Sequence, residues 1–220
     1  MSLVRLQGVV LRYRNRGEAD RLLTILTPDL GKILVLARGC RRQKSRFLAF
    51  CQLFCYGELI LQPYRDIFIL NQAEVKNSYF DIRNDMDKLS CATYIANLTE
   101  AVATTGENNA RLFKLILHSL SYISYSDRHP LELALIYELK LLEQIGYKPF
   151  LANGRFNGEI PVSSDAAETI HTILNSSTEQ AQRTPITPGA RQELNRLLSR
   201  YIKQKLDLQI KSRMFLDMIP

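Results

Sequence analysis

Histidine and cysteine are scarce in this sequence, which has three histidines and four cysteines among 220 residues. The histidines, His118, His129 and His171, are far apart and lack the spacing of metal ligands. Cys51 and Cys55 are the one close pair, and their separation is not the two-residue gap of a zinc knuckle. We therefore predict no metal site, and we expect the cysteines to be small buried apolar groups.

Long apolar runs are also missing. No stretch approaches the roughly 18 apolar residues of a membrane-spanning helix. The first 21 residues lack both the apolar core and the small-residue cleavage site of a signal peptide. These absences predict a cytoplasmic protein with no membrane partner, in a compartment where disulfides are rare.

Catalytic signatures are absent as well. The sequence has neither a glycine-rich motif that would cradle phosphates nor a G-x-S-x-G nucleophile elbow. A two-metal nuclease would need several convergent carboxylates, and no pattern signals them. We predict a protein that is not an enzyme and needs no cofactor, with a nuclease or other phosphodiesterase kept as an alternative.

Positive charge is present in excess, and it is concentrated near the N-terminus. The formal net charge of the chain is +7. Residues 1–80 carry 13 basic and 6 acidic side chains, whereas residues 81–220 carry 16 of each. A small domain that holds the whole charge excess is the electrostatic signature of a protein that binds phosphate backbones.

The densest charge lies in the sequence RGCRRQKSR, residues 38–46, where five of nine residues are basic and none is acidic. Arg12, Arg14 and Arg16 alternate at the end of the first expected strand, so they share one face of the predicted sheet if that strand extends to them. We predict that these segments bind DNA phosphates with little sequence preference, since no base-reading element is evident. The predicted DNA-binding residues are Arg12, Arg14, Arg16, Arg21, Lys32, Arg38, Arg41, Arg42, Lys44 and Arg46.

Short apolar segments separated by polar turns occupy residues 3–75. Strands are expected at residues 6–14, 21–27, 32–38, 52–63 and 66–75, with Pro28 and Gly31 in turn-forming positions. Five short strands with polar turns favour a small barrel over a layered α/β fold. The first candidate is an OB-type barrel, a fold that binds single strands along a groove. An RNA-binding factor of the same fold stays open as an alternative.

The periodicity becomes helical after about residue 85. Helices are expected within residues 85–105, 108–124 and 129–146, and the last is apolar nearly all round, as in the centre of a bundle. Residues 147–164 are expected to be a loop, and a short helix follows at about 165–175. After a polar connection at 176–186, Thr187 and Pro188 are predicted to begin the closing helix. The fold class is therefore α+β, with a barrel domain at 1–80 and a helical domain at 81–220.

A second basic cluster lies near the C-terminus. It could extend the DNA path or bind an acidic peptide. Alternatively, it binds no partner and is a solvated helix face whose charge is balanced by Glu193, Asp207 and Asp217. The cluster consists of Arg200, Lys203, Lys205, Lys211 and Arg213.

The order of several motifs resembles the bacterial RecO family of DNA recombination and repair mediators. These are GEADRL at 17–22, Thr27 to Lys32, ARGCRRQKSRF at 37–47, QAEV at 72–75, LLEQIGYKP at 141–149 and IKSRMFL at 210–216. The resemblance spans nearly the whole chain, and the ordered set is more specific than any one motif. It implies an OB-fold domain followed by a helical domain.

The resemblance also implies function and partners. RecO-like proteins bind single- and double-stranded DNA, anneal complementary strands, and with RecR help load RecA onto strands coated by the single-strand binding protein (SSB). Some members contact the acidic, hydrophobic C-terminal tail of SSB. Many carry a four-cysteine zinc site after the GYKP-like segment, but here no cysteine follows Cys91. We therefore expect a degenerate, cysteine-free insertion around 150–187, with the zinc site absent or collapsed to a shorter hairpin.

Overall fold

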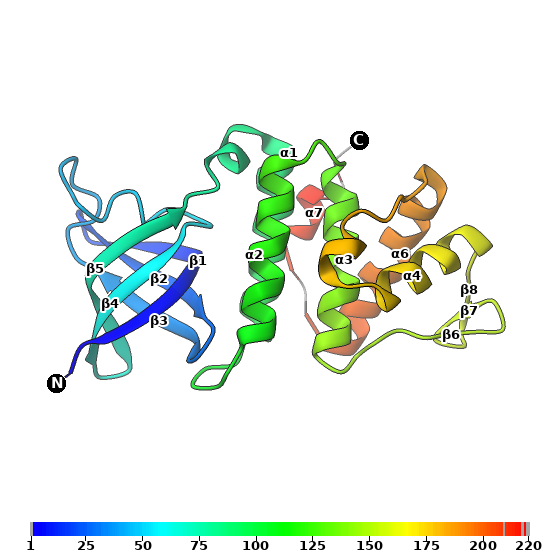
Figure 1. Cartoon of the computed structure of the whole chain (residues 1–220), viewed down its shortest axis with the longest axis horizontal. Helices are drawn as coiled ribbons and strands as arrows, with labels where there is room; N and C mark the ends of the chain where they lie inside the picture. The colour runs from blue at the N-terminus through cyan, green and yellow to red at the C-terminus, as the bar shows by residue number, and fades with distance from the viewer. Residues whose placement is uncertain (1, 209, 217, 219–220) are drawn as a thin grey trace.

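A five-stranded β-barrel forms the N-terminal part of the computed structural model, which describes residues 2–208, 210–216 and 218. The order around the closed barrel is β1-β2-β3-β5-β4, with β3 and β5 as the parallel pair (Figure 1). The predicted fold class, a barrel followed by helices, is confirmed. The strands are β1 (Val4–Arg16), β2 (Asp20–Thr27), β3 (Gly31–Ala37), β4 (Tyr56–Tyr64) and β5 (Ile67–Asn77).

Strand alternation fills the barrel. Leu23 and Ile25 of β2 and Leu59 of β4 have no exposed surface, because every second side chain of a strand points to the same side. The strand predicted at 52–63 begins later, at Tyr56. The residues before it form turns that bury Phe50 and Phe54, so their apolar character comes from packing and not from strand pairing.

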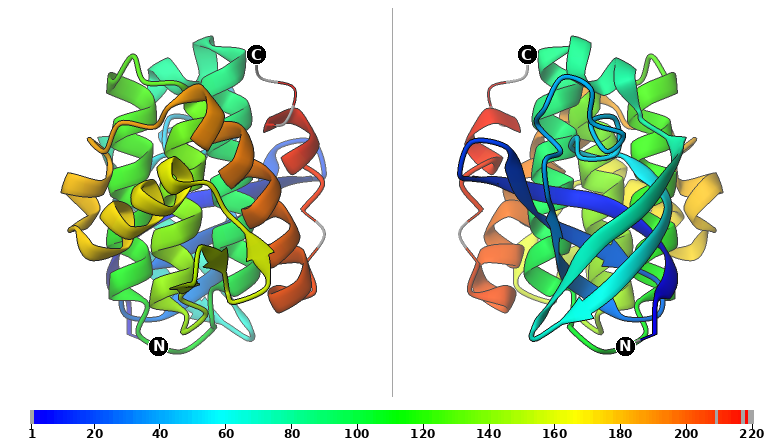
Figure 2. Two further views of the ribbon diagram at one scale, coloured as in Figure 1. Left: turned by 90° about the vertical axis from the view of Figure 1, so that its right-hand side faces the viewer. Right: turned by 90° about the vertical axis from the view of Figure 1, so that its left-hand side faces the viewer.

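Helices make up most of the remaining chain, and Figure 2 shows the molecule from the helical end and from the barrel end. Asp85 caps α1 by accepting from the backbone N–H groups of Asp87 and Lys88, and Thr187 caps α6 as predicted. Across the described ranges, no helix is long and apolar enough to cross a bilayer. The helical elements are η1 (Phe80–Asn84), α1 (Met86–Val102), α2 (Ala110–Tyr125), α3 (Pro130–Gln144), α4 (Ser164–Asn175), α5 (Thr178–Ala181), α6 (Pro188–Leu206) and α7 (Arg213–Leu216).

Helix α3 is the centre of the helical part, as its all-round apolar pattern predicted. Its residues from Leu133 to Leu142 are all buried, including Glu138 and Lys140. Arg213 of α7 forms an ion pair with Glu138, and the Tyr94 hydroxyl donates to the same carboxylate at 2.6 Å. A buried carboxylate needs such partners, since an unpaired buried charge costs several kcal/mol.

A small three-stranded sheet replaces part of the loop that we predicted at 147–164. It consists of β6 (Leu151–Ala152), β7 (Arg155–Phe156) and β8 (Ile160–Pro161). The turn between β6 and β7 is Asn153-Gly154, with a positive φ at both residues, which is the geometry that closes a two-residue hairpin. The polar connection predicted at 176–186 likewise contains the short helix α5.

The barrel and the helices are joined by both apolar packing and backbone hydrogen bonds. Val9, Leu26 and Phe54 belong to the same buried cluster as α1, α2 and α3. The Lys32 N–H donates to the Thr104 carbonyl at 2.8 Å, and the Asn109 N–H donates to the Pro28 carbonyl at 2.8 Å. The turn between β2 and β3 is thereby bonded to the segment between α1 and α2.

Gly57 of β4 leaves no room for a side chain. A Cβ atom there would lie 2.0 Å from the Glu74 carbonyl oxygen of β5. We expect Gly57→Ala to lower the free energy of unfolding by about 2 kcal/mol, because backbone atoms have to shift to admit the methyl group. Urea unfolding followed by circular dichroism measures this.

Gly189→Ala is the matched control, because a Cβ there meets only the Thr187 hydroxyl oxygen at 4.0 Å and the site lies in α6. It should leave stability unchanged or raise it by up to about 1 kcal/mol. Equal unfolding midpoints for Gly57→Ala and the wild type would contradict the close approach of β4 and β5.

Candidate nucleic-acid interface

The basic loop, residues 38–46, follows β3 and is bonded to the turn that joins β1 to β2. Asp20 accepts from the Gly39 N–H at 2.7 Å, and the Arg41 N–H donates to the Ala19 carbonyl at 2.9 Å. The Arg41 guanidinium also donates to the Gly17 carbonyl at 3.1 Å. The start of the basic loop and the β1–β2 turn therefore form one surface, and the segment between β3 and β4 projects from the barrel in Figure 1.

Apolar residues hold the basic loop in place. Cys40 within the loop and Phe47, Phe50 and Cys51 just after it are buried in the barrel's apolar cluster. Burial raises the pKa of both the Cys40 and Cys51 thiols, so they remain neutral. All four cysteines are buried with free thiols, as expected. The apolar anchors fix the backbone and leave the charged side chains outside.

Five of the predicted DNA-binding residues are exposed cations. Within the described ranges, none of these five side chains has a hydrogen bond or ion pair to another protein group. Arg41 and Arg46 are exposed too, but each guanidinium donates to a backbone carbonyl, that of Gly17 and that of Asn71. The barrel therefore presents unneutralised positive charge at the end that carries the basic loop. The five are Arg14, Arg16, Arg38, Arg42 and Lys44.

Three other predicted residues are half-buried and hold the structure together. Arg12 forms an ion pair with Glu100 of α1 at 2.6 Å, and the Lys32 ammonium donates to the Glu100 carbonyl at 2.7 Å. Arg21 donates to the Cys51 carbonyl, and its guanidinium lies 3.8 Å from the centre of the Tyr13 ring. These contacts orient the barrel and the basic loop, and a role for the three residues at DNA stays a prediction.

The second basic cluster does not form one surface. Arg200 and Lys205 border a hollow between α6 and the small sheet, whereas Lys203, Lys211 and Arg213 border another on a different side of α6. Four of the five side chains are exposed. Arg213 is turned inward, because it contacts Glu138 and Tyr94 in the helical core.

Comparison with known proteins identifies the family. The model of "Recombination protein O N terminal" matches residues 1–79, and that of "Recombination protein O C terminal" matches residues 83–160. The DNA repair protein RecO of Symbiobacterium thermophilum is 31% identical, with 99% of this chain and 98% of that protein aligned. That of Acetivibrio thermocellus is 30% identical, with 94% and 93% aligned. The chain belongs to the RecO family.

This match confirms the family resemblance seen in the sequence. RecO proteins are recombination mediators in DNA repair and are not enzymes, so the nuclease alternative is set aside. The described part of this RecO-family chain holds no group of three or more His, Cys, Asp or Glu side chains that would suit a metal ion. The small sheet of β6, β7 and β8 lies in the segment for which the sequence predicted a degenerate, cysteine-free insertion in place of a zinc site.

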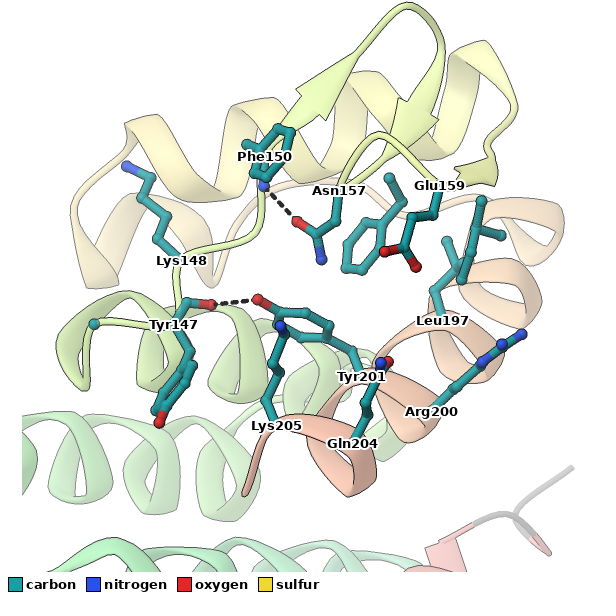
Figure 3. Close-up of a pocket in the computed structure, with 13 residues that line it drawn as sticks. Tyr147, Lys148, Phe150, Asn157, Glu159, Leu197, Arg200, Tyr201, Gln204 and Lys205 are labelled. Atoms are coloured by element: carbon teal, nitrogen blue, oxygen red, sulfur yellow. Dashed lines mark hydrogen bonds between the residues drawn. The ribbon is translucent and has the colours of Figure 1, made fainter. Parts of the chain in front are cut away.

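One group of residues was not predicted from the sequence. Tyr147, Phe150, Phe156 and Tyr201 line the hollow beside Arg200 and Lys205, and Figure 3 shows Tyr201 on the α6 side of it. They are distributed over 55 positions, from Tyr147 to Tyr201, so no local motif links them. The one signal was the aromatic content of a segment that is rich in glycine and asparagine.

Arg12 and Arg14 allow a test of the distinction between anchoring and exposed arginines. They are two residues apart on β1, but only Arg12 is paired with Glu100. We expect Arg12→Ala to lower the free energy of unfolding by about 1 kcal/mol, the upper range for a partly exposed ion pair. Arg14→Ala should change it by less than about 0.5 kcal/mol. Equal effects on the urea midpoint would show that the Arg12–Glu100 pair adds no stability.

Proposed function

We propose that this RecO-family protein binds single- and double-stranded DNA and anneals complementary single strands, with the basic loop and the end of β1 binding the phosphates. The observation that carries the proposal is a set of exposed, unpaired cations. Arg14 and Arg16 lie at the end of β1, and Arg38, Arg42 and Lys44 lie on the basic loop, which buried apolar residues hold in place. Such cations bind phosphates without displacing an intramolecular partner.

The proposal includes an electrostatic expectation. Five phosphate contacts on single-stranded DNA would make log K fall with log salt at a slope of about −3.5, because condensed counterions are released.

The family membership supports the further proposal that the protein helps load RecA onto SSB-coated strands together with RecR. The separate family models for residues 1–79 and 83–160 support a division into domains at 1–80 and 81–220. A cytoplasmic location remains our prediction.

A second observation favours a site for the SSB tail. The hollow bordered by Lys203 and Lys211 has apolar walls from Ile202, Leu208 and Met214, and a volume of about 230 Å³. An apolar floor with exposed cations at its rim is complementary to a peptide that is acidic and ends in hydrophobic residues. We propose this apolar hollow as the binding site of the SSB C-terminal tail.

The main test is annealing of SSB-coated complementary oligonucleotides by the variant Arg41→Glu, Arg42→Glu, Lys44→Glu. We expect annealing to be lost and the slope of log K against log salt to flatten by about 1.4, because two of the five phosphate contacts, those of Arg42 and Lys44, disappear. Fluorescence energy transfer between labelled strands measures annealing, and anisotropy in a salt series gives the slope.

The control variant is Arg111→Glu, Lys114→Glu, Arg183→Glu, which changes the net charge equally at exposed positions of the helical part. It should anneal like the wild type. Equal loss in both triple variants would mean that net charge alone matters, and equal retention would remove the basic loop from the proposal. Preference for a matched RNA strand in competition would favour the RNA-binding alternative.

The SSB site is tested by calorimetric titration of an acidic peptide with a hydrophobic C-terminus. Lys203→Glu with Lys211→Glu should weaken binding roughly tenfold, because two exposed charge pairs become repulsive. Arg111→Glu with Lys114→Glu should leave the affinity unchanged. Absence of binding by the wild-type protein at several hundred micromolar peptide would overturn the assignment of the apolar hollow.

A further inference from the structure

The hollow between α6 and the small sheet, called the aromatic pocket here, is drawn in Figure 3 and lies at the end of the molecule opposite the barrel in Figure 1. Its volume is about 240 Å³. Helix α6 contributes Leu197, Arg200, Tyr201, Gln204 and Lys205, which recur at the three- and four-residue spacing of one helix face. The opposite wall comes from the segment that runs from Tyr147 to Ile160.

The floor of the aromatic pocket is rigid. Phe156 is 1% exposed and meets the Tyr201 ring edge-on, with ring centres 5.4 Å apart. The Tyr201 hydroxyl donates to the Tyr147 carbonyl at 3.2 Å, which fixes the start of the opposite wall. Burial raises the pKa of Tyr201, so this hydroxyl stays protonated and keeps its role as donor.

Two exposed aromatic residues belong to the wall opposite α6. Phe150 lines the pocket, whereas the Tyr147 ring points away from Tyr201 and the Tyr147 carbonyl faces the pocket (Figure 3). Phe150 is 58% exposed and Tyr147 is 43% exposed. The backbone holds Phe150 in this position, because its N–H donates to the Asn157 side-chain oxygen at 3.0 Å and its carbonyl accepts from the Asn157 N–H at 2.8 Å. An exposed aromatic ring on a fixed backbone is a ready stacking surface.

Polar groups complete the aromatic pocket. The Asn157 side-chain nitrogen is buried close to the Tyr201 hydroxyl, and its proximity offsets part of the effect of burial on the pKa of Tyr201. Arg200 and Lys205 are exposed cations at one side, and Glu159 is the carboxylate of the lining.

We propose that the aromatic pocket binds one unstacked base of single-stranded DNA, with Phe150 as the stacking surface and Arg200 and Lys205 at the adjoining phosphates. Amide and carboxylate groups in the lining match the polar edge of a base better than an apolar peptide side chain.

This inference rests on the proposed function and adds to it a second DNA contact, remote from the basic loop. The test uses the full chain in two backgrounds, wild type and Arg41→Glu, Arg42→Glu, Lys44→Glu. The probes are a short labelled single-stranded oligonucleotide and the same oligonucleotide with abasic positions. Anisotropy gives both affinities in each background, with and without Phe150→Ala and Tyr147→Ala.

We expect the abasic probe to bind the loop variant roughly fivefold or more weakly than the intact probe, the effect of losing one stacked base. The added changes Phe150→Ala and Tyr147→Ala should abolish this difference. Phe80→Ala, which removes an equally exposed ring from η1, should preserve it.

Other results are equally informative. Equal affinities for the two probes in the loop variant, or a difference that survives Phe150→Ala and Tyr147→Ala, would overturn the base pocket and leave the basic loop unaffected. A pocket-dependent difference with no effect of the loop variant would support the pocket and contradict the proposed role of the loop. Displacement of the intact probe by an acidic peptide whose own binding requires Phe150 would mark a peptide site and overturn the proposal.

Discussion

The backbone hydrogen bonds between the β2–β3 turn and the segment after α1 are the constraint on which the arrangement of this molecule depends. Backbone groups that leave water must find partners, and here the Lys32 N–H and the Pro28 carbonyl find theirs across the junction. Gly31 permits this approach, because a Cβ atom there would lie 2.2 Å from the Thr104 carbonyl oxygen. The Arg12–Glu100 pair lies at the same junction. The barrel is therefore held against the helices in one orientation, which sets the direction in which the basic loop projects.

The basic loop shows how one short segment separates two tasks. Cys40, Phe47 and Phe50 enter the apolar interior of the barrel, and the intervening cations remain in water. The loop backbone loses its conformational entropy on folding, and the burial of these apolar side chains offsets that cost. Little further conformational entropy is therefore lost when a phosphate chain binds. Exposed cations also attract a polyanion from a distance and release it when salt is raised. The basic loop is therefore suited to reversible binding of a polyanion.

The barrel, the long helices and the α6 cap were predictable because each is encoded locally, by strand alternation, helical periodicity, and Thr187 followed by Pro188. The anchoring of Arg12 and Lys32 was not, because Glu100 is far away in the sequence and only the fold brings it near. The inward turn of Arg213 has the same cause, since Glu138 lies on another helix. The small sheet was predictable in principle, because Asn153-Gly154 is a hairpin signal that we read as part of a loop.

The two proposed DNA contacts differ in chemistry, and the difference suits annealing. Cations at phosphates leave base edges exposed, so a strand held by the basic loop remains able to pair with its complement. A pocket around Phe150 instead sequesters a base, which fixes a strand at one nucleotide while its neighbours stay available. Because these contacts lie at opposite ends of a molecule whose junction is fixed, one protein has room for two strands at once. Base pairing would then have to release only the single sequestered base and not the whole bound strand, so the newly formed duplex is able to dissociate from the protein.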